Sequence, residues 1–133
     1  MVVVSSARAL EARGLEGDRV TLGRPGSKRQ VTLVQEEHLP VIAGLAHVPV
    51  VTAETVRRNI VVRGVNLLAL AKLRFALGDE VVLLGTGPCA PCGKMDEAIG
   101  PGGFQAMRGH GGITAVVERG GTLHVGAAVR ALG

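Results

Sequence analysis

The apolar residues of this chain fall into short runs that are separated by glycines, and such runs are typical of strands. Val and Leu dominate the runs, and branched aliphatic side chains favour extended backbone. We predict strands, in chain order, at Val2–Ser5 with an extension towards Leu10, Gln30–Val34, Ile60–Val62, Lys72–Leu77, Glu80–Leu84, Ile113–Glu118 and Thr122–Val125. The segment Ala127–Leu132 closes the chain.

A few short helices separate these strands. We predict helices at Gln35–Ala43 and Thr52–Val56, a helix or turn at Val65–Ala71, a short helix that starts near Cys92, and a helical turn at Phe104–Met107. Short strands joined by glycine turns and a few short helices are typical of a mainly β (α+β) distorted barrel. A chain of 133 residues fits one domain, so we expect residues 1–133 to fold together.

Composition indicates which residue types form the core and which charge a partner would carry. Hydrophobic residues make up 47% of the chain but aromatic residues only 2%, so the core must be built of Val, Leu, Ala and Ile. The formal net charge of +4 suits an anionic partner. Without aromatic platforms or a basic helix, nucleic-acid binding is poorly supported. A small molecule that carries a phosphate fits the same charge.

The first ten residues, MVVVSSARAL, are too short and lack the basic start of a signal peptide. No apolar run reaches the length that spans a bilayer. We therefore expect no membrane partner and a cytoplasmic location. Two cysteines in such a chain point to a reducing compartment.

Both cysteines, Cys89 and Cys92, lie in the glycine-rich stretch Thr86–Gly112. They could be buried apolar fillers, a structural disulfide, half of a zinc site completed by His110 or His124, or reactive thiols. The prolines and glycines around them argue against a dense core, and a zinc site would need further ligands. A thiol at a helix start with cations nearby has a lowered pKa, and the stretch supplies Lys94 and Arg108 as cations. The sequence favours the reactive thiol.

A thioredoxin-like domain is the obvious source of such a Cys-x-x-Cys motif. That fold requires a long helix after the cysteines. Here the helix that would begin near Cys92 is interrupted by Gly100–Gly103, so the surroundings do not support a thioredoxin-like domain.

A second group of polar residues, Arg57, Arg58 and Asn59, stands at the entrance of the strand Ile60–Val62. Guanidinium groups and an amide suit a phosphate or a pterin-like ring. A surface cluster paired with acids explains the same residues equally well. Glycines of the cysteine stretch, Gly111 among them, permit close approach of backbone to a ligand.

These motifs form an ordered set: GLEGDR (14–19), KRQVTLVQEEHL (28–39), TAETVRRNIVV (52–62), GVNLL (64–68), PCAPCGKM (88–95), the GxGGI of Gly109–Ile113 and GGTLHVGAAV (120–129). Together they resemble the MOSC domain, the C-terminal domain of molybdenum cofactor sulfurases. The resemblance covers nearly the whole chain and implies a mostly β, strongly distorted barrel with short helices. It departs from the family at Val20, where GDR is often followed by His.

The resemblance also implies a chemistry. Members handle sulfur and the molybdenum cofactor, molybdopterin with its metal. The signature cysteine falls on Cys92, which implies a sulfur carrier or a molybdenum ligand there, and Cys89 matches a subset of small stand-alone members. The Arg-x-Asn pattern falls on Arg57 and Asn59 and implies cofactor contacts. Pyridoxal phosphate belongs to a domain that this chain lacks, so it would act only on a partner protein or in fused members.

Three hypotheses follow. In the first, the protein binds the molybdenum cofactor and carries sulfur as a persulfide on Cys92, with Cys89 able to release it and with a cysteine desulfurase as a possible partner. In the second, it is a small molybdenum reductase of N-hydroxylated compounds with Cys92 as metal ligand and an electron-donor partner. In the third, Cys89, Cys92 and His110 form a non-catalytic zinc or cofactor module. For the first two we expect Arg57, Arg58, Asn59, Lys94, Arg108 and Gly111 to contact the cofactor.

Overall fold

The computed structural model describes residues 6–10, 14–15, 30–89 and 95–132. The predicted strand at Val2–Ser5, the loops around GLEGDR and GRPGSK, Cys92 and Lys94 therefore lie largely or wholly outside the described residues. The described strands are β1 (Ser6–Leu10), β2 (Gly14–Leu15), β3 (Val31–Gln35), β4 (Ile60–Val62), β5 (Arg74–Leu77), β6 (Val81–Pro88), β7 (Ile113–Arg119), β8 (Gly121–His124) and β9 (Val129–Ala131). The described helices are α1 (His38–Ala46), a 3-10 helix (Leu67–Leu70), α2 (Met95–Ile99) and α3 (Gly103–Met107).

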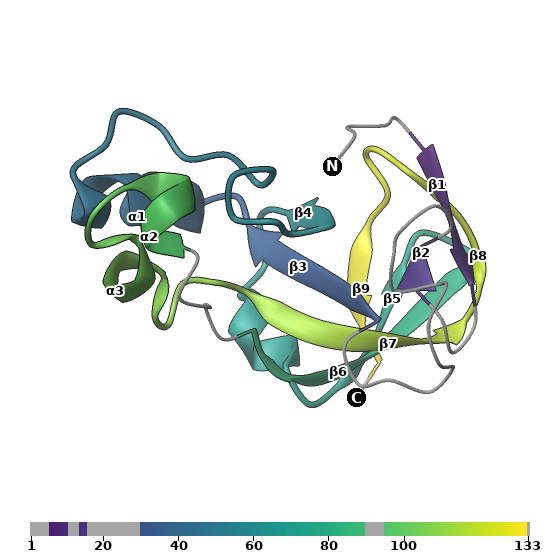
Figure 1. Cartoon of the computed structure of the whole chain (residues 1–133). Helices are drawn as coiled ribbons and strands as arrows, with labels where there is room; N and C mark the ends of the chain where they lie inside the picture. Colours follow the sequence, from purple (N-terminus) through teal and green to yellow (C-terminus); the bar gives the residue numbers. More distant parts are fainter. Residues whose placement is uncertain (1–5, 11–13, 16–29, 90–94, 133) are drawn as a thin grey trace.

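The described strands form two curved sheets. One has the order β4-β3-β7-β6-β5-β9 and the other has the order β2-β1-β8. β8 follows β7 after a single residue, so the two sheets are directly connected along the chain at this point. Figure 1 shows the strands wrapping into a partial barrel, with β1, β2 and β8 at one end of the molecule. The structure thus confirms the mainly β, distorted barrel with short helices.

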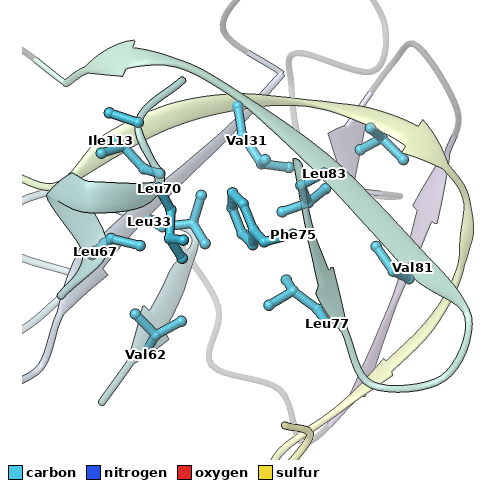
Figure 2. Close-up of a cluster of buried hydrophobic side chains, with 13 residues drawn as sticks. Val31, Leu33, Val62, Leu67, Leu70, Phe75, Leu77, Val81, Leu83 and Ile113 are labelled. Carbon is cyan, nitrogen blue, oxygen red and sulfur yellow. The ribbon is translucent and has the colours of Figure 1, made fainter. Parts of the chain in front are cut away.

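The side chains of the barrel interior are aliphatic except for one aromatic ring, that of Phe75, which is fully buried. Alternate residues of β6 and β7 point inward, whereas Val31, Thr32, Leu33 and Val34 of β3 are all buried because both faces of that strand are covered. Figure 2 shows Phe75 surrounded by side chains from several strands, including Val31, Leu33 and Leu83. Burial of such side chains contributes roughly 1.5–3 kcal/mol each and is the main stabilising force here.

A second, smaller core lies among the helices. Its buried members are Ile42, Ala43 and Ala46 of α1, Val51 and Val56 of the following loop, Met95 of α2, and Ala106 and Met107 of α3. Figure 1 shows α1, α2 and α3 grouped at the end of the molecule opposite β1 and β8. The cysteine stretch therefore begins at the barrel, at the end of β6, and passes through this helical cluster before it returns as β7.

The predicted helix at Thr52–Val56 is wrong. The segment forms a single hydrogen-bonded turn in which the Thr52 hydroxyl accepts a hydrogen bond from the Thr55 N–H at 3.2 Å. Thr52 therefore caps this turn, but the turn ends where Arg57 adopts a left-handed φ of 59° and the chain continues through Asn59 into β4. The chain has no room to add helical turns before it must pair with β3.

Other boundaries differ by a few residues. α1 starts at His38 rather than Gln35, since residues 36–37 form a turn in which the Glu37 carboxylate accepts a hydrogen bond from the Gly64 N–H. That bond lowers the pKa of Glu37. β5 starts at Arg74 rather than Lys72, because the Leu73 N–H still bonds back to Leu70. The short helix predicted to start near Cys92 corresponds to α2, whose first turn carries Asp96 and Glu97.

The start of β7 packs directly on β3 at Gly112, and this contact yields a prediction. A Cβ built on Gly112 would overlap the Leu33 carbonyl oxygen, and the φ of Gly112 is +85°. Gly109 has a similar φ of +81°, but a Cβ there would meet no atom within 4 Å. Gly109→Ala should therefore lower the unfolding free energy by about 1–2 kcal/mol through backbone strain alone.

Gly112→Ala carries the same strain plus an overlap, which adds about 1–3 kcal/mol. Urea unfolding of the two variants measures the difference. Equal losses of stability would contradict the close approach of β7 to β3.

Candidate functional site

The segment 56–59 connects the helical cluster to β4. Val56 is fully buried in the helical core, Arg57 is exposed, Arg58 is 2% exposed and Asn59 is half-buried. The alternation accompanies the end of the turn over residues 53–57, where Arg57 holds a left-handed φ and its neighbours do not. The two adjacent arginines therefore meet different surroundings.

The Arg58 guanidinium bonds to backbone carbonyls of three separate segments. Its Nε donates to the Gly111 carbonyl at 2.7 Å and its Nη1 to the Val56 carbonyl at 2.7 Å. Its Nη2 donates to the Cys89 carbonyl at 3.5 Å. The residue thus joins the turn before β4, the end of β6 and the loop before β7. We call this set of contacts the Arg58 latch.

The absence of a side chain at Gly111 makes the latch possible. A Cβ at that position would lie 2.9 Å from the Cys89 carbonyl oxygen and 3.0 Å from Arg58 Nη2. Either contact would push the guanidinium or the loop away. The glycine that the sequence marked for close approach to a ligand is therefore in close contact with Arg58.

Asn59 fastens the same turn to the sheet. Its Oδ1 accepts hydrogen bonds from the backbone N–H and the hydroxyl of Thr32, each at 3.0 Å. Its own N–H donates to the Thr32 carbonyl at 3.0 Å. Through Asn59 the turn is anchored to β3, and through Arg58 it is anchored to the cysteine segment.

Arg57 is the exposed member of the cluster. It holds a left-handed φ of 59°, which non-glycine residues adopt at a cost of roughly 1–2 kcal/mol. No hydrogen bond ties its guanidinium to another part of the described chain. Arg57 is thus available to an external anion, whereas Arg58 supports the loops from within.

Cys89 follows directly after β6 and is 4% exposed. Its N–H donates to the Gly112 carbonyl at 2.9 Å, which extends the pairing of β6 and β7 to the cysteine itself. It is a free cysteine. Cys92 and Lys94 lie outside the described residues, so their roles stay predictions.

A hollow of about 180 Å³ lies against Cys89. Arg108 is exposed and is the charged residue among the described residues that line it. These described lining residues are Leu68, Pro88, Cys89, Arg108, Gly109, Gly111 and Gly112. The structure therefore brings together Cys89, Arg108 and Gly111 of the predicted site residues, and Arg58 contacts two of these three. We call this hollow the Cys89 cavity.

The histidines give no metal site within the described ranges. His110 Nδ1 donates to the Ala106 carbonyl at 3.1 Å, and its ring meets the His38 ring edge-on at a centroid distance of 5.5 Å. No group of three or more His, Cys, Asp or Glu side chains among the described residues could hold a metal ion. The described part of the zinc hypothesis, Cys89 with His110, therefore gains no support here.

Sequence reasoning missed Leu68 and Pro88 as walls of the cavity and did not foresee that Arg58 is buried. No local pattern marked Arg58 as buried, because its burial depends on contacts with Cys89 and Gly111 far along the chain. Leu68 had no signal either, since only the fold places the 3-10 helix near the end of β6.

The Arg58 latch can be tested by removing the guanidinium while keeping an unbranched side chain. Arg58→Met leaves the Val56, Cys89 and Gly111 carbonyls without these partners, and each unsatisfied buried group costs about 1–3 kcal/mol. We expect Arg58→Met to lower the unfolding free energy by at least about 3 kcal/mol. Arg57→Met, the exposed neighbour, should change it by less than about 0.5 kcal/mol.

Thermal and urea unfolding of both variants measure the contrast. Similar effects at the two positions would show that the buried guanidinium contributes nothing particular to the fold.

Solved structures of other proteins share this fold. The chain matches the YuaD protein from Bacillus subtilis with a TM-score of 0.79 and 22% identity, over 96% of this chain and 85% of that one. It matches YiiM from Escherichia coli with a TM-score of 0.74 and 22% identity, over 98% of this chain and 64% of that one. YiiM from Geobacillus stearothermophilus gives a TM-score of 0.69 and 17% identity, over 79% and 55%. These likenesses show the fold, and the chain spans under two thirds of either YiiM.

A search of curated proteins found no match to the chain. No helix among the described residues is long and apolar enough to cross a bilayer. The model of one family, the MOSC domain, matches residues 17–130, which is most of the sequence. The matched range includes both cysteines and the turn at Arg57–Asn59, which we call the RRN turn. The chain belongs to the MOSC domain family.

Proposed function

We propose that this protein binds the molybdenum cofactor, or a related anionic pterin, beside its cysteine segment and carries sulfur on Cys92 for transfer. The observation that supports this function best is the Arg58 latch, which packs the RRN turn against Cys89 and Gly111. Two motifs that lie far apart in the sequence are thereby held as one surface. Two exposed cations belong to these motifs: Arg57 is the chain neighbour of Arg58, and Arg108 lines the Cys89 cavity.

The described residues suit part of such a cofactor. The Cys89 cavity of about 180 Å³ is smaller than the roughly 300–1,000 Å³ of ordinary small-molecule sites. A pterin cannot be enclosed by it, so the ring and the phosphate would rest on the surface outside. Exposed guanidinium groups are well suited to a phosphate because they offer paired donors and a fixed charge.

Each residue then has a distinct role. Arg57 and Arg108 would attract and hold the anionic parts of the cofactor. Arg58 and Asn59 would keep the turn and the loop in place, as their hydrogen bonds to backbone and to Thr32 indicate. Cys92 would hold a sulfur atom as a persulfide, since a thiolate can carry sulfur in that form. The bound cofactor would supply the molybdenum centre to which the sulfur is delivered.

The role of Arg57 predicts a change in binding without a change in folding. Loss of one hydrogen bond to a charged group costs about 1.5–3 kcal/mol. Arg57→Met should therefore weaken binding of the isolated cofactor about tenfold to hundredfold, as measured by fluorescence titration under anaerobic conditions. Arg130→Met is the matched control, because Arg130 is an exposed arginine on β9, at the opposite edge of the sheet from β4.

The cofactor role is wrong if wild-type protein does not bind the cofactor. If the wild type binds the cofactor and Arg57→Met binds it equally well, Arg57 is not the cation that holds the cofactor.

Cys89 and Cys92 should also differ in reactivity towards a large reagent. Cys89 is 4% exposed and lies beside a small cavity, so a bulky maleimide cannot reach its thiol without opening the fold. We expect fluorescein maleimide to label Cys92 ahead of Cys89 in native protein, and both equally in denaturant. Peptide mass spectrometry locates the label, and earlier labelling of Cys89 would contradict the assignment of Cys92 as the accessible carrier.

A further inference from the structure

The Cys89 cavity has properties that narrow what it can bind. Its volume of about 180 Å³ admits only a molecule of a few heavy atoms. Among the described residues that line it, the charged one is Arg108, and a guanidinium selects an anion. The other lining side chains, Leu68, Pro88 and Cys89, offer apolar or sulfur atoms. Such a wall suits a soft, weakly hydrated atom rather than a second charged oxygen.

We propose that the Cys89 cavity binds a small sulfane-sulfur oxyanion of the thiosulfate class and that Cys89 is the cysteine that first accepts its sulfur. The anionic end would face Arg108 and the sulfane sulfur would face Cys89. This inference rests on the proposed function and adds to it a class of sulfur donor and a role for the second cysteine. It accounts for a buried free cysteine beside a cation-lined hollow, which a bulky cofactor cannot enter.

The chemistry balances without an added oxidant. The Cys89 thiol loses its proton to solvent, and the thiolate attacks the sulfane sulfur of thiosulfate. A sulfur–sulfur bond forms to Cys89 while the sulfur–sulfur bond of thiosulfate breaks, so sulfite leaves with the electron pair. Cys89 is then a persulfide. The thiolate of Cys92, three residues along the chain, can take the outer sulfur and return Cys89 to its thiolate.

The loading step is tested with reduced protein and thiosulfate under anaerobic conditions. Sulfite release and the gain of one sulfur atom in the intact mass are followed in the wild type, Cys89→Ser, Cys92→Ser, Arg108→Gln and Arg119→Gln. Cys92→Ser should still release sulfite and gain a sulfur atom, whereas Cys89→Ser should do neither. Arg108→Gln should slow loading at least about tenfold, because the guanidinium holds the oxyanion. Arg119→Gln, an exposed arginine of β7 that does not line the cavity, should load normally.

A second measurement on the unmodified chain covers the case in which Cys89→Ser does not fold. Thiosulfate should protect Cys89 of the wild type against iodoacetate, a reagent small enough for the cavity, and inorganic sulfate should protect it less. Loading that persists in Cys89→Ser, loading that is unchanged in Arg108→Gln, or a lack of protection would each overturn the proposal.

The same assay separates this inference from the proposed function. Suppose that a cysteine desulfurase with cysteine loads sulfur on Cys92 but thiosulfate loads none. The carrier role of Cys92 then stands, and thiosulfate is not the sulfur donor. A protein that loads from neither source and does not bind the cofactor loses both.

Discussion

The Arg58 guanidinium is the interaction on which the candidate site depends. It bonds to carbonyls of the turn before β4, of the end of β6 and of the loop before β7. The segment before β4 is a single hydrogen-bonded turn and the loop before β7 is rich in glycine, so neither is held in place by regular sheet pairing. A buried guanidinium offers several donors in a rigid plane, and it can therefore satisfy carbonyls that arrive from different directions.

The two cores explain why such a latch is needed. The barrel core is aliphatic and closes around Phe75, and the helical core is small and built around Ile42 and Met107. The cysteine segment leaves the first and enters the second, and apolar burial is not directional enough to fix its path between them. Hydrogen bonds from Arg58, together with the anchor of Asn59 on Thr32, supply that direction. The result is a cysteine held beside a small cavity with an exposed arginine at its edge.

The sequence predicted most of the strands because apolar runs and glycine turns mark them directly. It failed at Thr52–Val56, where the predicted helix forms only one turn before Asn59 bonds to Thr32 of β3. It grouped Arg57 with Arg58 because adjacent arginines look alike in sequence. Their separation into an exposed and a buried residue depends on tertiary contacts with Gly111 and Cys89, residues more than thirty positions away. The cavity could not be predicted either, since Leu68 reaches it only through the packing of the fold.

Hydrogen exchange at the Cys89 amide tests the latch most directly. That N–H is bonded to the Gly112 carbonyl at the point where the Arg58 latch holds β6 and β7 together. If the latch fixes this junction, the Cys89 amide exchanges slowly in the wild type and in Arg57→Met. In Arg58→Met it becomes fast, while amides of buried β3 residues such as Leu33 stay protected. A Cys89 amide that remains as protected as Leu33 in folded Arg58→Met would show that the site holds its shape without Arg58.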